Sequence, residues 1–340
     1  CGNLNTESQS VTLIYVDGTK GWQDIHDSTS DVSGAPSFIV ATGGTITTCG
    51  DFKIHTFTGS STFTINSAPT PANNKVSYMV VAGGGGAGNW AGGGGGAGGF
   101  REGKASTDPY TASPLAATPC SALTLTAATF PVTIGAGGAG QPAGTSWPST
   151  QACAGTNSVF STITSTGGGY GGSNDRPPNM SGGAGGSGGG ASRCGSGAGG
   201  AGNTPPVSPP QGNNGGTGTE NAPTGYFGGG GGGATAVGAD APNSVGGNGG
   251  AGATSSINGT PTARAGGGGA GTTTASNTSS GGTGGGGNGG TGGGANPGSN
   301  GTANTGGGGG GAGATSPSGA SAGTGGTGGS GIVILRYKFQ

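Results

Sequence analysis

Apolar side chains in this sequence gather in a few short runs, which are separated by long stretches of small residues. Residues 52–57 alternate apolar and polar positions, and residues 62–65 repeat the alternation after a glycine–serine turn. A period of two predicts strands that bury one side and leave the other facing water. The run 75–82 is more continuously apolar, which is typical of a central strand. These runs predict a β framework over residues 52–82.

Further strand-like runs occur at 11–16, 37–41, 44–47, 130–134 and 159–163. Between residues 167 and 330, few side chains are both apolar and larger than alanine. Residues 331–339 then give a strand signal as strong as any in the chain. If this last strand pairs with the earlier ones, both ends of the glycine-rich stretch are fixed to one framework.

No stretch of the sequence shows the apolar period of 3.6 residues that marks an amphipathic helix. Glycine, which supplies 94 of the 340 residues, disfavours a helix by about 1 kcal/mol per residue. The predicted fold class is therefore all-β. We expect a β-sandwich or jelly-roll-like framework of strands at about 52–82, 130–134, 159–163 and 331–339, carrying a large glycine-rich insertion.

The glycines occur in blocks such as 228–233 and 306–311, without the strict three-residue repeat of collagen. Two interpretations are open, a flexible linker and a packed bundle of polyglycine II helices at about 83–100 and 167–330. Such helices have three residues per turn and no internal hydrogen bonds, so each backbone group must bond to a neighbouring segment. The closing strand favours the bundle, because a disordered tail has no reason to end in a strand of the buried type.

The strand signals suggest two regions. Residues 1–50 are interpreted as an N-terminal strand and linker segment for attachment or assembly, and residues 51–340 as the glycine-rich domain. The chain begins at Cys1, which is consistent with a processed or truncated product and also with a lipidated N-terminus.

The charge and the motifs of the sequence argue against several classes of function. Charged residues make up 6% of the chain and the net charge is −1, so no basic surface for nucleic acid is expected. No apolar run reaches the roughly 18 residues of a membrane span. The G-x-S-x-G match at 185–189 has no histidine after it, and His26 and His55 stand in patterns that fit a loop and a strand. We expect no enzyme activity, no metal site and no cofactor.

Five cysteines are widely spaced and form no C-x-x-C pair. With Cys1 set aside, four remain, and they allow three pairings. A disulfide between Cys120 and Cys153 would close a modest loop in a region that is poor in apolar residues. The free thiol form remains an alternative.

Four segments together resemble a known family. They are 53–58 (KIHTFT), 63–65 (FTI), 78–86 (YMVVAGGGG) and the closing 328–337 (GGSGIVILRY). The chain resembles the glycine-rich domain of tail-fibre-like and adhesin proteins of bacteriophages, cyanophages among them. The resemblance implies a virion structural protein on the surface of an extracellular particle. It also implies a homo-oligomer, with a trimer as one option, and other virion proteins as partners.

Loops between glycine segments are the predicted recognition elements, because aromatic side chains on a surface of small residues suit sugars or an outer-membrane protein. The candidate receptor contacts are Trp90, Phe100, Trp147, Tyr170, Tyr226 and Phe227. The alternative is that each ring caps an end of the bundle.

Three functions are therefore weighed. The first is a phage tail-fibre or adhesin-like subunit that recognises the host surface. The second is a purely structural virion decoration or a self-assembling extracellular fibre subunit. The third is a bacterial lipoprotein that Cys1 anchors to the cell surface.

Overall fold

The computed structural model describes residues 11–19, 21–27, 38–69, 73–117, 121–144, 151–173, 180–193, 197–221, 225–242, 244–275, 278–315 and 321–340. The regular secondary structure of this part of the chain consists of β-strands alone. The all-β prediction is therefore confirmed. Trp147, Cys1 and Cys120, which the sequence analysis named as candidate positions, lie outside the described residues.

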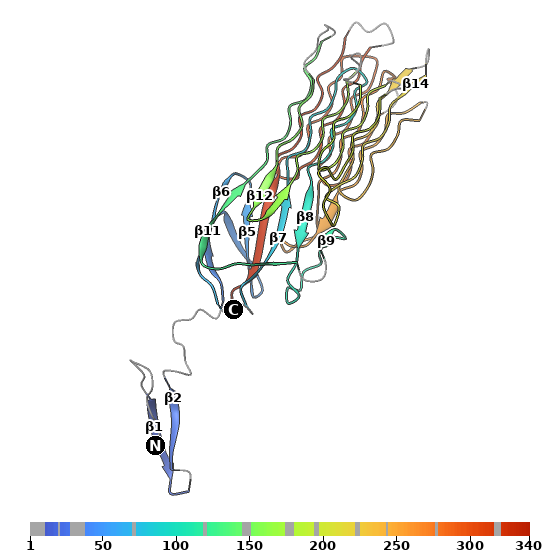
Figure 1. Cartoon of the computed structure of the whole chain (residues 1–340). Helices are drawn as coiled ribbons and strands as arrows, with labels where there is room; N and C mark the ends of the chain where they lie inside the picture. The colour runs from blue at the N-terminus through green and yellow to red at the C-terminus, as the bar shows by residue number, and fades with distance from the viewer. Residues whose placement is uncertain are drawn as a thin grey trace.

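Two sheets form the framework (Figure 1). The seven-stranded sheet has the order β4 (Thr45–Cys49), β5 (Phe52–Phe57), β18 (Ile332–Lys338), β7 (Lys75–Val81), β8 (Phe100–Gly103) and β9 (Ala116–Ala117), with β10 (Leu123–Thr124) also paired to β7. The five-stranded sheet has the order β13 (Ile163–Ser165), β12 (Ser158–Phe160), β11 (Ala128–Thr133), β6 (Ser61–Ser67) and β3 (Val40–Thr42).

Three two-stranded hairpins complete the described strands. They are β1 (Val11–Asp17) with β2 (Gly21–Asp27), β14 (Thr219–Asn221) with β15 (Gly225–Phe227), and β16 (Ala253–Ser255) with β17 (Thr262–Arg264).

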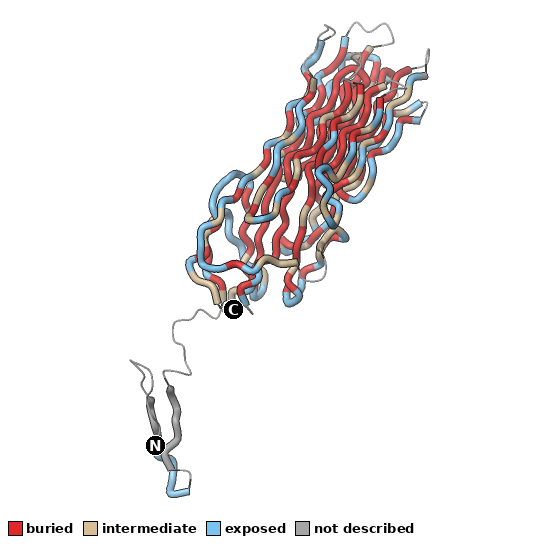
Figure 2. The backbone as a smooth tube through the Cα atoms, in the orientation of Figure 1, coloured by how far each residue is buried: buried red, intermediate tan, exposed pale blue. Residues whose placement is uncertain are grey.

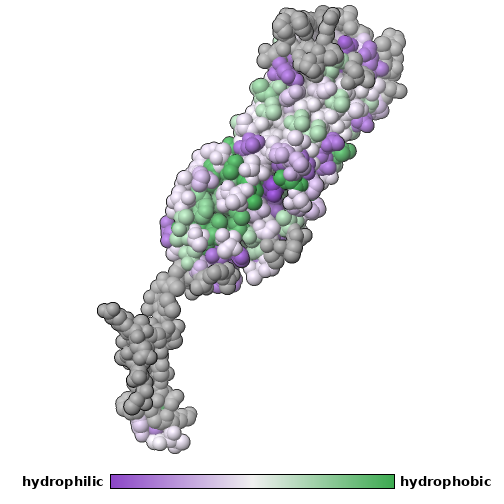
Figure 3. Space-filling view, in the orientation of Figure 1, coloured by the Kyte–Doolittle hydropathy of each residue, from purple (hydrophilic) through white to green (hydrophobic). Residues whose placement is uncertain are grey.

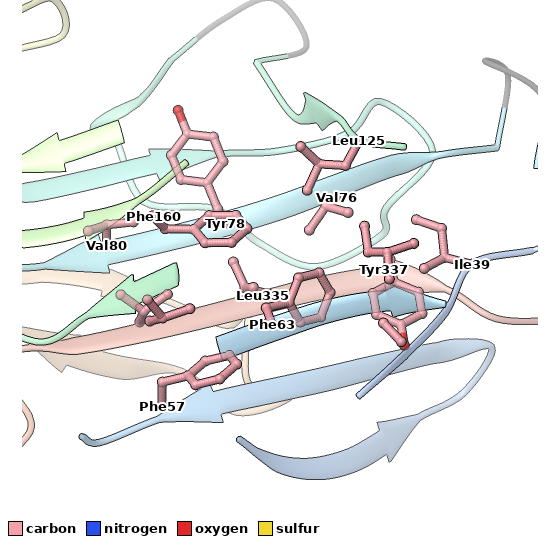
Figure 4. Close-up of a cluster of buried hydrophobic side chains, with 14 residues drawn as sticks. Ile39, Phe57, Phe63, Val76, Tyr78, Val80, Leu125, Phe160, Leu335 and Tyr337 are labelled. Atoms are coloured by element: carbon pink, nitrogen blue, oxygen red, sulfur yellow. The ribbon is translucent and has the colours of Figure 1, made fainter. Parts of the chain in front are cut away.

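The two framework sheets enclose an apolar core in a sandwich-like arrangement (Figure 4). Phe57 of β5, Phe63 of β6, Phe160 of β12 and Leu335 of β18 are all at most 2% exposed. The rings of Phe63 and Phe160 meet edge to face with centroids 6.0 Å apart. Figure 3 shows, on one face of the molecule, that hydrophobic residues gather over the framework rather than over the glycine-rich part.

The closing strand β18 lies between β5 and β7 and is antiparallel to both. Its first four residues, Ile332 to Leu335, are all apolar and buried, which fits a strand that is covered on both faces. Thus the prediction that the last strand pairs with the earlier ones is confirmed. The glycine-rich stretch 166–331 leaves the framework after β13 and re-enters it at β18.

Strands β3 and β4 fall within the first fifty residues but pair with the framework strands β6 and β5. Gly43 and Gly44 join them with φ angles of +116° and +62°, where L-residues are strained. A β-carbon on Gly43 would lie 2.2 Å from the carbonyl oxygen of Thr62. The two glycines thus let the chain pass from one sheet to the other without a longer loop.

Beyond the framework, extended glycine-rich segments run side by side away from the sheets (Figure 1). Their interior is largely buried (Figure 2). The backbone of residues 83–88 shows how they pack. In N–H to carbonyl order, its hydrogen bonds are Gly83–Thr156, Gly84–Gly329, Gly85–Gly96, Gly86–Cys153, Ala87–Gly326 and Gly88–Gly93, with N···O distances of 2.8 to 3.1 Å.

Every third residue of this segment therefore donates to the same neighbour. The carbonyl groups follow the same cycle and accept from the segments 168–171, 138–141 and 309–312. Three neighbours accept and three donate, so six segments surround residues 83–88. A three-residue cycle is the arrangement expected of polyglycine II helices. The left-handed helical form of the segments stays a prediction.

Glycine is required in the bundle because neighbouring backbones lie where a side chain would be. A β-carbon on Gly84 would lie 2.1 Å from the carbonyl oxygen of Gly307. Residues 134–141 and 151–157 also belong to the bundle, although the sequence analysis did not assign them to it. In the first of these, Ala136 and Ala139 are exposed while Gly138 between them is buried, so burial also repeats every three residues.

Candidate recognition site at the distal end of the bundle

The distal end is the end of the bundle that lies furthest from the framework sheets (Figure 1). The chain leaves β7, runs through 82–88, reverses at residues 89–91 and returns through 92–99 to β8. The β14–β15 hairpin lies at the same end (Figure 1). Here the distal cluster, formed by Trp90, Ala91, Tyr226, Ala314 and Ala322, is the third apolar core of the molecule.

The turn that carries Trp90 is strained and held in place by a neighbouring segment. Trp90 and Ala91 have φ angles of 53° and 54°, a left-handed conformation that costs roughly 1–2 kcal/mol for a residue with a β-carbon. The Asn89 N–H donates to Gln141 Oε1 at 3.1 Å, and Asn89 Nδ2 donates to the Pro142 carbonyl at 2.9 Å. Strained backbone positions cluster at active sites and ligand-binding regions, so this turn is a candidate functional position.

Arg193 lies over both rings of the distal cluster. Its guanidinium carbon is 4.5 Å from the Trp90 ring centroid and 4.0 Å from the Tyr226 centroid, and the two rings are 5.8 Å apart. Trp90 and Tyr226 are each 8% exposed, whereas Arg193 is half-buried. Arg193 is therefore the part of this cluster that a ligand meets first. A planar guanidinium held on aromatic faces suits carboxylate or phosphate groups.

The structure divides the predicted aromatic contacts. Trp90 and Tyr226 come together in the distal cluster, which is the arrangement expected of rings that cap the bundle. Phe100 and Phe227 are each 1% exposed, so they are not displayed on loops as expected. Phe100 begins β8 and packs among Met79 and Ile334 between framework and bundle.

Tyr170 lies within the bundle, where it is half-buried. Its ring occupies the space beside Gly183, whose added β-carbon would lie 2.6 Å from Tyr170 Cδ1. Arg193 was not among the predicted contacts, although its charge sets it apart in the sequence. Arg176, Arg193 and Arg264 are the only basic residues between 167 and 330. A cation in an almost uncharged region is a candidate for a functional role.

A second group of polar residues lies at the opposite end, in a cleft of about 320 Å³ that Asp51, Lys75, Asp108 and Lys338 help to line. Arg336 Nε donates to Asp108 Oδ1 at 2.8 Å, and the side chains are 3% and 1% exposed. Ser77 Oγ donates to the second oxygen of Asp108 at 3.0 Å. Because the buried Asp108 carboxylate is satisfied by Arg336 and Ser77, we assign these three residues to stability.

Glu102 of β8 connects the framework to the strand β16 and to the loop at Ser113. Its two carboxylate oxygens accept from Ser255 Oγ at 2.6 Å and from the Ser113 N–H at 2.8 Å. Burial, with the nearby carboxylates of Glu102 and Asp108, raises the pKa of Tyr110 far above its usual range. Tyr110 therefore stays neutral at physiological pH.

His55 lies in the strand β5, as the sequence predicted, and its side chain is buried. Its Nδ1 lies 2.7 Å from the Gly43 carbonyl oxygen and must donate to it. Nε2 then accepts from the Tyr337 hydroxyl at 3.0 Å. Burial lowers the pKa of His55 and raises the pKa of Tyr337 to about 12. Both groups keep these roles at neutral pH.

Among the described residues, neither the exposed Cys153 nor the partly buried Cys49 has a disulfide partner. Because Cys120 lies outside the described residues, its pairing with Cys153 stays a prediction. Among the described residues, no three His, Cys, Asp or Glu side chains gather as they would around a metal ion. In the same part of the chain, no helix has the length and apolar character needed to cross a membrane.

A family model described as a glycine-rich domain matches residues 55–338, which span both framework and bundle. No curated protein matches the chain.

Proposed function

Since the chain belongs to the glycine-rich domain family, we propose that it is a phage virion structural protein, a tail-fibre or adhesin-like subunit that presents loops for host-surface recognition. The proposal places the protein on the virion surface, as part of a homo-oligomer and beside other virion proteins. Its ligand would be a host surface glycan or an outer-membrane protein.

The distal cluster is the observation that carries this proposal. A bundle whose interior is bonded through its backbone gives the loops at its end a stiff base, and recognition residues are commonly placed on loops of a rigid scaffold. Trp90 sits in a strained turn that is fixed by Asn89, and the half-buried Arg193 lies over its ring. This is the place where the described residues combine strain, aromatic rings and a cation.

Binding to cells tests the proposal. Fluorescently labelled full-length protein is incubated with a panel of cyanobacteria and other marine bacteria, and the bound fraction is measured. We expect retention on at least one strain, and Arg193→Ala should weaken it about tenfold or more, as for the loss of an interface hot spot. Arg101→Ala, at a half-buried arginine of β8 in the framework, is the matched control and should bind like the wild type. A folded wild type that binds no strain, or an Arg193→Ala variant that binds as well as the control, would overturn the proposal.

A further inference from the structure

The framework sandwich has an open edge where β4 ends the seven-stranded sheet. Residues Thr45 to Thr48 of this strand are all exposed, and Ile46 is 44% exposed. Val40, in the neighbouring edge strand β3, is 48% exposed. Natural edge strands are usually protected by charges, proline or bulges, and β4 has neither a charged residue nor a proline. The strand is thus suited to pair with a further strand.

The N-terminal hairpin has the complementary property. Ile14, Tyr15 and Val16 of β1 are 49%, 53% and 48% exposed. Because neighbouring residues of a strand point to opposite faces, the hairpin shows large apolar side chains on both faces. Among the described strands, β1 pairs with β2 alone. A two-stranded hairpin by itself is marginally stable in water, so it gains stability from a third strand.

We propose that β1 of one copy of this protein adds to the edge of β4 in a second copy, so that the hairpin extends the seven-stranded sheet. In the structure of the single chain neither edge uses the other, because β4 pairs with β5 and β1 with β2. A second copy supplies both missing partners at once. Residues 14–16 and β4 are uncharged, so no like charges oppose the pairing, and main-chain bonding would supply the affinity.

Such a contact joins two different surfaces and is therefore head-to-tail. Repeating it gives a closed ring if the rotation closes, and a filament if it does not. The proposed pairing does not depend on host recognition. It uses strands β1 and β4, which contribute no residue to the distal cluster.

Two variants of the full chain test the pairing, with mass measured by light scattering after size exclusion. Thr45→Lys/Thr47→Lys blocks the β4 edge and keeps β1, whereas Ile14→Lys/Val16→Lys blocks β1 and keeps β4. We expect a wild type of several chains and two variants with the mass of a single chain. An equimolar mixture of the variants should form a complex of two chains, because one supplies β1 and the other supplies β4.

A matched control, Thr324→Lys/Thr327→Lys, adds the same charge at exposed positions of the bundle and should assemble like the wild type. A wild type that stays monomeric at every concentration overturns the proposal. So does a β4 variant that still associates, which would indicate hairpin-to-hairpin contact, or a β1 variant that still associates, which would indicate edge-to-edge contact. A mixture that remains monomeric also contradicts it, provided that both variants show the wild-type β-sheet circular dichroism.

Discussion

The N–H group of Gly85 donates to the carbonyl oxygen of Gly96 at 2.8 Å, and this bond joins the outgoing and returning arms of the Trp90 turn. The Gly96 N–H donates in turn to Gly169 at 2.8 Å. Each such bond needs two backbones at a separation that leaves no room for a side chain. Backbone hydrogen bonds therefore hold the interior of the bundle together, whereas an ordinary protein core is filled by apolar side chains.

Replacing Gly85 by alanine should destabilise the protein strongly. The added β-carbon would lie 2.1 Å from the Gly169 carbonyl oxygen, which is backbone and is fixed by its own hydrogen bonds. Overpacking usually costs 1–3 kcal/mol, and we expect about 3 kcal/mol or more here because the obstacle cannot rotate away. The measurement is the free energy of unfolding in denaturant.

Gly59→Ala is the control for this change. Nothing lies within 4 Å of a β-carbon at Gly59, so its free energy of unfolding should stay within about 1 kcal/mol of the wild type. Equal effects of the two substitutions would show that Gly85 is not in a tightly packed bundle.

Asparagine side chains at the surface complete the hydrogen bonding of the outer segments. The Oδ1 atoms of Asn248, Asn288 and Asn300 accept from the N–H groups of Ser280, Gly281 and Thr327, at 2.8, 2.9 and 2.9 Å. Asn300→Ala should lower the free energy of unfolding by about 1 kcal/mol and speed amide exchange at Thr327. The readout is hydrogen exchange resolved to that peptide.

The substitution Asn300→Asp keeps an acceptor oxygen at the same place and should retain the protection of Thr327. If both substitutions leave exchange at Thr327 unchanged, the side chain does not complete the lattice at that position.

The buried ion pair of Arg336 and Asp108 should be costly to break on one side. Arg336→Met leaves the Asp108 carboxylate buried without its cation, and we expect a loss of about 3–5 kcal/mol in the free energy of unfolding. Adding Asp108→Asn to this variant should recover part of the loss.

The control is Lys338→Met, at an exposed position of the same strand, which should lower the free energy of unfolding by less than about 1 kcal/mol. A loss at Arg336 no larger than at Lys338 would refute the assignment.

Stability should fall as the pH drops below about 6.5, the ordinary pKa of histidine. Burial lowers the pKa of His55 in the folded protein, so the unfolded chain takes up a proton first. The contribution is complete above pH 6.5 and is lost as the pH falls towards the lower folded pKa, by at most about 1.4 kcal/mol per pH unit.

Unfolding curves of wild type and His55→Gln between pH of about 7 and 5 measure this effect, and their difference isolates one group. His26→Gln, at the only other histidine, should keep the slope assigned to His55. If the His55→Gln and wild-type curves run parallel, His55 is not the source.

The framework could be predicted from the sequence because its strands alternate or carry continuous apolar runs, as at β5, β7 and β18. Which glycine segments lie side by side in the bundle could not be predicted, because glycine has no side chain that would specify a partner segment. A partial signal existed at the outer face, where exposed Ser321, Thr324 and Thr327 alternate with pairs of small residues. That three-residue spacing marks the outward positions of a bundle segment.

Aromatic residues were harder to place. Phe100 and Trp90 both flank glycine blocks, yet one begins a framework strand and the other occupies a strained distal turn. Composition alone does not separate these settings, because burial depends on which segments meet there. Arg193 stands out in the sequence by its charge, but its place over Trp90 and Tyr226 follows only from the structure.

Amide hydrogen exchange over residues 83–88 and 93–99 tests the central claim most directly, that glycine segments form an ordered scaffold bonded through the backbone. Because their N–H groups are buried and hydrogen-bonded, we predict exchange at least about a thousandfold slower than in an unfolded chain. Exchange at the unfolded rate across both segments, with the framework strands still protected, would contradict the account.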